Sequence, residues 1–204
     1  PVEGTILLTD KDNIFITDAR YIEEVNNFLT INDEFIIYDN KDVSEEDNQT
    51  FFSDCENVGF EENYVTYANY ENIIRKYRIR NIEETDRIIE KERMIKDEKE
   101  ILYIEKACEI TDKCFEHLLN YIKIGMTERQ VAFEIEKFFL DNGADGVAFE
   151  SIVASGENSS KPHAIPSDKI IRFGDPITID FGAKYKGYCA DMTRTIFAGE
   201  VSDE

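Results

Sequence analysis

The stretch ITIDFGAKYKGYCADMTRT, residues 177–195, decides how the C-terminal part of this chain folds. Its apolar residues Ile177, Ile179 and Phe181 alternate with more polar ones, which is typical of a strand with one buried face. A second run of strand-forming residues follows at 188–198, after a short turn that contains Gly and Lys. The stretch therefore predicts an antiparallel hairpin.

Two acidic residues of this hairpin, Asp180 and Asp191, are the candidate functional pair. A four-residue turn at residues 184–187 would place them directly opposite each other, with Cβ atoms about 5 Å apart. At roughly 4 Å and an effective dielectric near 20, two carboxylates repel by about 4 kcal/mol, so something must offset the repulsion. Spacing alone leaves three explanations: pairing with Arg194, a proton shared in an acid–base dyad, or a bound divalent metal.

The tripeptide Asp180-Phe181-Gly182 also matches the metal-binding motif of protein kinases. A kinase would need a Gly-rich phosphate loop and a His-Arg-Asp catalytic loop earlier in the chain, and neither is there. The sequence therefore argues against a kinase.

The segment before the hairpin predicts a pair of helices. Asp97 with Glu100 and Thr127 with Gln130 have the spacing of capping boxes, and each pair precedes an amphipathic pattern. A strand and a polar loop at residues 155–168 then lead to the hairpin. This half of the chain is predicted to be α+β.

The first half of the chain alternates short strands with helices, which predicts an α/β domain. Strands are expected at residues 5–9, 13–17, 34–38 and 57–60, and two helices are expected with Asp18 and Thr66 as their N-caps. Residues 81–96 are charged and helix-prone. We place the domain division within this region, with one domain at residues 1–85 and the other at residues 86–204.

Composition disfavours several kinds of partner and site. The chain has 23 Lys and Arg against 44 Asp and Glu, a net charge of −21, which disfavours nucleic acid and anionic membranes. Its 4 Cys contain no CxxC pair and there are only 2 His, so a zinc finger is not predicted. The cysteines indicate reduced thiols in a cytoplasmic protein.

In its hairpin, its polar loop and its N-terminal strands, the chain resembles the pita-bread metallopeptidases. This family includes methionine aminopeptidase, aminopeptidase P, prolidase and creatinase. Residues 177–195 resemble their first metal-binding segment, and SGENSSKPHA, residues 155–164, resembles the substrate loop of the members that cleave Xaa-Pro bonds. Residues 7–9 and 15–21 resemble the creatinase-type N-terminal domain that those members carry.

The resemblance implies an α/β N-terminal domain with a mixed sheet, followed by the α+β first half of a pita-bread catalytic domain. It implies two divalent ions, most often Mn²⁺ with Co²⁺ or Zn²⁺ as alternatives, held by two Asp, one His and two Glu. By motif, Asp180 chelates one ion and Asp191 bridges both. Metal-bound hydroxide would attack the Xaa-Pro bond of a peptide. His163 would contact the substrate and help a proton reach the leaving proline nitrogen, whereas His117 is expected to be structural.

The resemblance also implies a homodimer, and it leaves other functions open. The remaining His and Glu ligands are not in this sequence, so we expect a chain truncated at both ends that is inactive and binds metal weakly. The alternatives are a metal-free creatinase-like amidinohydrolase and a non-catalytic binding module of the same fold. Retention of both Asp disfavours the amidinohydrolase, and the separate N-terminal domain disfavours methionine aminopeptidase.

Overall fold

The computed structural model describes residues 2–29 and 35–200 and divides the chain into two compact units, Pro1–Met94 and Ile95–Glu204. The division falls later than the predicted one after residue 85. Residues 81–96 were expected to be helical, but strand β5 (Ile82–Glu84) precedes the short helix α4 (Ile88–Glu92). Strand β5 pairs in parallel with β4 (Val58–Phe60), which ties this region to the first unit.

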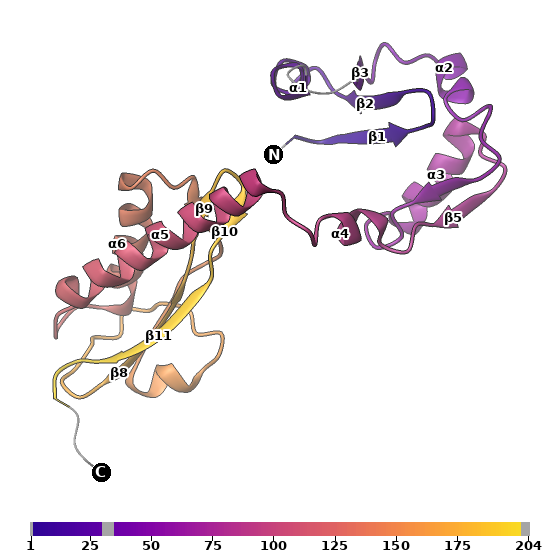
Figure 1. The fold of residues 1–204 in the computed structure, drawn as a ribbon. Coiled ribbons are helices and arrows are strands. Elements are labelled where there is room, and N and C mark those ends of the chain that lie inside the picture. Colours follow the sequence, from indigo (N-terminus) through magenta and orange to yellow (C-terminus); the bar gives the residue numbers. More distant parts are fainter. Residues whose placement is uncertain (1, 30–34, 201–204) are drawn as a thin grey trace. The chain divides into compact units, whose positions relative to one another are not determined.

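The first unit contains the mixed sheet that the resemblance implies (Figure 1). Strand β1 (Gly4–Leu8) pairs antiparallel with β2 (Asn13–Thr17), and β2 pairs in parallel with β3 (Phe35–Asp39). The order β1-β2-β3 confirms the predicted hairpin and a third strand. Glu34, the predicted first residue of that strand, lies outside the described residues.

Helices α1 (Ile22–Leu29), α2 (Glu45–Thr50) and α3 (Tyr67–Tyr77) complete this unit. Thr66 caps α3 as predicted, because its side chain accepts from the backbone N–H of Asn69. Asp18 does not cap α1: its carboxylate instead accepts from the backbone N–H and the guanidinium of Arg20. The small apolar core comprises Leu7, Ile14, Ile16, Tyr77 and Ile79.

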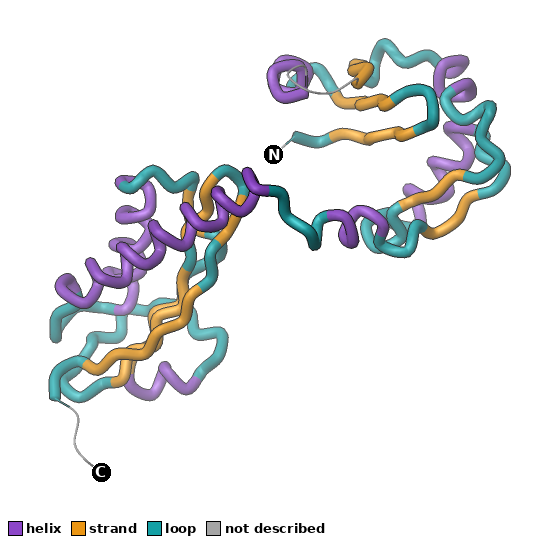
Figure 2. Tube along the Cα trace, viewed as in Figure 1, coloured by secondary structure: helices purple, strands orange, loops and turns teal. Residues whose placement is uncertain are grey.

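The second unit begins with the predicted helix pair, α5 (Glu98–Tyr121) and α6 (Glu128–Asp141), shown in Figure 2. Both capping boxes are present. The side chains of Asp97 and Thr127 accept from backbone N–H groups three residues on, and Glu100 and Gln130 return the contact. These residues satisfy backbone donors that the first turn of a helix leaves unpaired.

The strands of this unit form two short sheets, ordered β11-β8-β7 and β10-β9-β6. Their bounds are β6 Gly146–Val147, β7 Ile152–Ser155, β8 Pro176–Phe181, β9 Ala183–Tyr185, β10 Tyr188–Cys189 and β11 Met192–Phe197, with a 3₁₀ helix η1 at Gly156–Ser160. The predicted hairpin is therefore interrupted in both arms, at Gly182 and at residues 190–191, and its arms pass from one sheet to the other there.

The alternation that defines the hairpin also builds the core. Ile177, Ile179 and Phe181 are each 0% exposed. They belong to one cluster with Cys114, Leu118, Val131, Ile135 and Phe139 of the helix pair. Burial of each large apolar side chain contributes about 1.5–3 kcal/mol, so the helices hold this face of β8 inward and leave Thr178 and Asp180 on the other face.

Candidate active site

The turn of the hairpin differs from the prediction and changes which residues face each other. It consists of Lys186 and Gly187 alone, since Tyr185 pairs with Tyr188. Both turn residues have positive φ, 50° and 85°, as a two-residue hairpin turn whose twist matches its strands requires. The prediction of a four-residue turn was wrong because it did not anticipate a lysine in this left-handed conformation.

The shorter turn displaces the two aspartates along the hairpin. Asp180 lies opposite Thr193, and Asp191 lies two positions away in the bend before β11. The prediction of direct opposition was therefore wrong, and the two are diagonal neighbours. Diagonal neighbours in a regular sheet are about 7–8 Å apart, farther than directly opposed residues, so the repulsion between the two carboxylates is weaker than the predicted register implied.

Gly182 makes the bend possible. A Cβ atom at this position would lie 1.8 Å from the carbonyl oxygen of Ala190 and 3.3 Å from Cα of Asp191. The backbone of one arm thus lies directly against that of the other. The adjacent residue is held by α5, because the buried hydroxyl of Thr111 accepts from the backbone N–H of Ala183 at 3.0 Å. Helix α5 therefore fixes the position of the aspartate-bearing bend.

The two carboxylates have few protein partners. Asp180 is half-buried and its Oδ1 accepts from the Thr193 hydroxyl at 2.8 Å, whereas Asp191 is exposed. Within residues 2–29 and 35–200 neither carboxylate forms an ion pair. Most of their lone pairs are consequently free to accept a ligand.

Arg194 does not neutralise the pair. It lies opposite Ile179, on the alternate face of the hairpin, and its guanidinium carbon is 5.9 Å from the centre of the Phe115 ring on α5. One guanidinium nitrogen donates to the carbonyl oxygen of Thr193. This arrangement disfavours the arginine-paired explanation.

The donors present suit a hard divalent cation in kind, since carboxylate oxygens are what such ions prefer. They do not suffice in number. No group of three or more His, Cys, Asp or Glu with metal-site geometry occurs in the described part of the chain. Asp180 and Asp191 could therefore supply two ligands of a centre whose other ligands come from elsewhere.

The two histidines lie in different surroundings. His163 is exposed in the loop after η1. His117 on α5 is stacked on Phe138 and Tyr121, and its Nε2 lies 2.7 Å from Oε1 of Glu134 on α6. These contacts join α5 to α6, which agrees with the expectation that His117 is a structural residue.

A further acidic residue, Glu128, was not singled out from the sequence. It is the first residue of α6 and is 0% exposed. Its Oε1 accepts from the backbone N–H and hydroxyl of Ser155, at 2.8 and 2.9 Å. Its Oε2 accepts from the backbone N–H and hydroxyl of Ser167, at 3.1 and 2.6 Å. The amide of Asn158 donates to both oxygens, at 3.1 and 3.3 Å.

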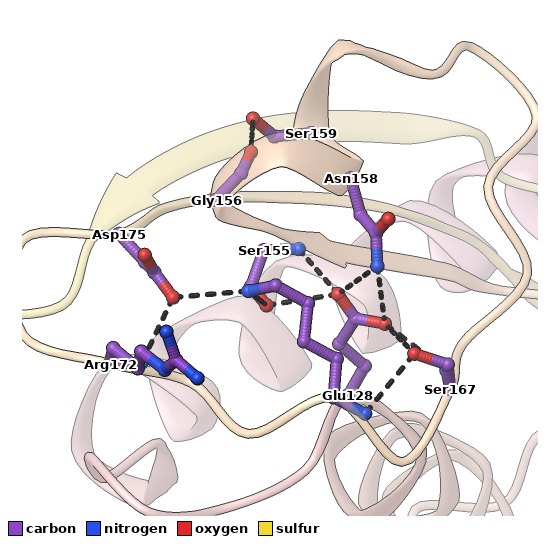
Figure 3. A network of polar contacts seen from close by, with 9 residues as sticks. Glu128, Ser155, Gly156, Asn158, Ser159, Ser167, Arg172 and Asp175 are labelled. Carbon is purple, nitrogen blue, oxygen red and sulfur yellow. Dashed lines mark hydrogen bonds and ion pairs between the residues drawn. The ribbon is translucent and has the colours of Figure 1, made fainter.

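Figure 3 shows these donors converging on the Glu128 carboxylate. Burial alone would raise the pKa of Glu128, but the hydrogen bonds from Ser167, Ser155 and Asn158 outweigh burial and hold it below its usual range. Lys169 lies beside the network and donates to the Ser155 hydroxyl at 2.9 Å and to Asp175 at 3.2 Å. Glu128 is thus a buried, charged and fully partnered carboxylate.

Both units match known families over regions that agree with this architecture. Residues 103–204, which contain most of α5, all of α6 and the aspartate-bearing hairpin, match metallopeptidase family M24. Residues 2–95 match the creatinase/prolidase N-terminal domain. The chain belongs to metallopeptidase family M24, as the resemblance predicted.

Solved relatives share the fold of the whole chain. An Xaa-Pro dipeptidase from Bacillus anthracis is 36% identical with a TM-score of 0.88, over 100% of this chain and 57% of that chain. An X-Pro aminopeptidase from Thermotoga maritima is 34% identical with a TM-score of 0.84, over 98% of this chain and 55% of that chain.

A curated relative matches in sequence. An Xaa-Pro dipeptidase from Pyrococcus horikoshii is 42% identical over 130 residues, which are 64% of this chain and 37% of the relative.

The chain thus spans little more than half of these solved chains and about a third of the curated relative. Its four cysteines are free thiols. No helix within the described residues is long and apolar enough to cross a membrane.

Proposed function

We propose that a full-length protein containing this chain hydrolyses Xaa-Pro peptide bonds with the help of divalent metal ions, and that Asp180 and Asp191 supply two of the metal ligands. The observation that carries the proposal is the pair of unneutralised carboxylates at the bend of one hairpin, within the region that matches the metallopeptidase family. The remaining ligands would come from a region of the full-length protein that corresponds to the part of its relatives that this chain does not span.

Each residue has a distinct task in this proposal. Asp180, oriented by the Thr193 hydroxyl, would hold one ion, and Asp191 would help to hold both. Bound divalent ions supply a water of lowered pKa and positive charge for the oxyanion that develops during hydrolysis. His163 contacts the peptide and delivers a proton to the proline nitrogen as it leaves. The proposal includes Mn²⁺ as the metal, a homodimer and a cytoplasmic location.

The first test measures hydrolysis of an Xaa-Pro dipeptide by the full-length enzyme, after chelation and return of Mn²⁺, Co²⁺ or Zn²⁺. Asp191→Asn should abolish the activity, because loss of a metal ligand removes several kcal/mol of transition-state stabilisation. Asp112→Asn, an exposed aspartate on α5, is the matched control and should retain full activity. If Asp191→Asn keeps more than about a tenth of the activity, the bridging role is wrong.

Substrate preference refines the proposal. A dipeptidase should cleave only the Xaa-Pro dipeptide, whereas an aminopeptidase should also remove the first residue of longer peptides, and Xaa-Ala peptides should be left intact by both. For the 204-residue chain by itself, calorimetric titration with Mn²⁺ should show binding weaker than micromolar, since tight divalent sites use several ligands for each ion and this chain offers two carboxylates. Micromolar affinity would mean that these residues form a complete site.

A further inference from the structure

The loop that carries His163 is held at both ends by one side chain. Each oxygen of Glu128 binds one end of the loop. One oxygen accepts from Ser155, where the loop leaves β7, and the other accepts from Ser167, where the loop returns to α6. Asn158, inside the loop, donates to both oxygens. The carboxylate therefore joins the two ends of an eleven-residue segment, residues 156–166, that contains His163.

Backbone contacts fix the same geometry from the helix side. The N–H groups of Glu128 and Arg129, which have no acceptor within α6, donate to the carbonyl oxygens of Lys169 at 3.2 Å and Ser167 at 3.1 Å. The start of α6 and the end of the loop are thus hydrogen-bonded in both directions. A negative charge at the first helical residue is also favoured by the helix dipole.

No neutral side chain could replace this carboxylate without loss. Both oxygens accept only, and the donors around them include two backbone N–H groups that cannot be reoriented. A glutamine would turn its NH₂ group toward one of these N–H groups, so one end of the loop would lose its acceptor while the shape of the side chain is kept. Glu128→Gln therefore removes the charge and one acceptor of Glu128 while it keeps the packing of the side chain.

We infer that Glu128 is a positioning residue for substrate recognition: its buried carboxylate closes the loop of residues 156–166 and thereby orients His163. The inference rests on the proposed function for the role of His163, but the closure of the loop does not. Glu128 touches neither His163 nor the two aspartates in the hydrogen bonds of the described residues, so it acts through the loop backbone.

The test uses the full-length enzyme with Glu128→Gln, and Glu134→Gln is its matched control. Glu134 lies on the same helix and contacts His117 instead of the loop. Amide hydrogen exchange of peptides that cover residues 156–166 should accelerate at least about tenfold in Glu128→Gln, because one end of the loop is released. It should not change in Glu134→Gln. Equal exchange in Glu128→Gln and wild type would overturn the closure of the loop by Glu128.

A double-mutant cycle then tests the positioning role. Glu128→Gln and His163→Gln should each lower kcat/KM for the Xaa-Pro dipeptide, and the double variant should lose no more than His163→Gln alone, because the first change acts through the second residue. A merely structural role predicts losses that multiply, and such a result would overturn the inference. If His163→Gln has wild-type activity, the proposed role of His163 fails, while the exchange result still decides whether Glu128 closes the loop.

Ser167→Ala keeps the test decisive if Glu128→Gln does not fold. It removes the hydroxyl donor at one end of the loop and leaves Ser155 and Asn158 bound to Glu128. Faster exchange at residues 160–166 together with coupling to His163→Gln would support the inference. Unchanged exchange, or losses that multiply, would overturn it.

Discussion

The second unit contains two acidic regions that are built in opposite ways. Glu128 is wholly buried and three residues donate hydrogen bonds to it, whereas Asp180 has one hydroxyl partner and Asp191 is exposed. A carboxylate that organises the fold is saturated by the protein, because an unpartnered buried charge is costly. A carboxylate that binds a ligand must keep lone pairs available. Under the proposed function, the number of hydrogen-bond partners therefore distinguishes Glu128 from the two candidate metal ligands.

The bend beneath the aspartates should be the most sensitive position. Gly182→Ala would place Cβ against the Ala190 carbonyl oxygen and should cost about 3 kcal/mol or more of unfolding free energy. Gly187→Ala is the control: it has positive φ but open space around it, so about 1–2 kcal/mol is expected. Urea denaturation followed by circular dichroism measures both. Equal losses would show that the close approach at Gly182 is relaxed easily.

Substitution of the buried acid, Glu128, should cause the next largest loss of stability. Glu128→Ala leaves the donors of Ser155, Asn158 and Ser167 without their acceptor and should destabilise the second unit by about 3 kcal/mol. Glu157→Ala removes an exposed carboxylate from the same loop and should change stability by less than about 0.5 kcal/mol. Similar values for the two variants in urea denaturation would contradict the distinction drawn between the two kinds of acid.

Acid should weaken the contribution of Glu128 selectively. Because its folded-state pKa lies below the unfolded value of about 4.3, its charge stabilises the fold fully above that value. The contribution is lost as pH falls through the folded-state pKa. The stability difference between wild type and Glu128→Gln should therefore be constant near neutral pH and shrink below about pH 4. Denaturation curves at several pH values test this, and a difference that grows in acid would contradict it.

The hydroxyl beside Asp180 should matter more for metal than for folding. Thr193→Val removes the hydrogen bond to Oδ1 at an exposed site, so stability should fall by only about 0.5 kcal/mol. In the full-length enzyme the affinity for Mn²⁺ should fall about tenfold, as expected when a group that orients a metal ligand is lost. Thr195→Val on the same strand is the control, and an equal effect on Mn²⁺ affinity would argue against orientation by Thr193.

The smallest stability effect is expected at Asp191. Asp191→Asn removes an exposed charge and should leave the unfolding free energy of the chain within about 0.5 kcal/mol of wild type. The same change should have the largest effect on activity in the full-length enzyme. A large loss of stability would mean that Asp191 has a structural role, and the contrast with Glu128 would then fail.

Local patterns predicted much of this unit correctly. The alternation at Ile177, Ile179 and Phe181 identified the buried face, and Asp97 and Thr127 marked the starts of the helices, because periodicity and capping depend on neighbouring residues. The register of the hairpin depends on the backbone conformation of Lys186, which its residue type does not indicate. This conformation alone determines whether the two aspartates are opposite or diagonal.

Glu128 could not be recognised from local patterns for a different reason. A glutamate in the first turn of a helix is common, since it favours the helix dipole. Its partners Ser155 and Ser167 lie 27 and 39 residues further along the chain, and only the tertiary fold brings them together. The strand at β5 was missed similarly, because its partner β4 is distant in sequence.

The proposed closure of the loop of residues 156–166 by Glu128 also bears on how the loop could vary among relatives. Lengthening a loop whose ends are already joined costs little, about 0.6 kcal/mol for each doubling. Residues 159–166 can therefore be replaced while the three residues that donate to Glu128, Ser155, Asn158 and Ser167, are kept. New peptide preferences could be grafted onto this framework by changing residues 159–166 and leaving the three donors unchanged.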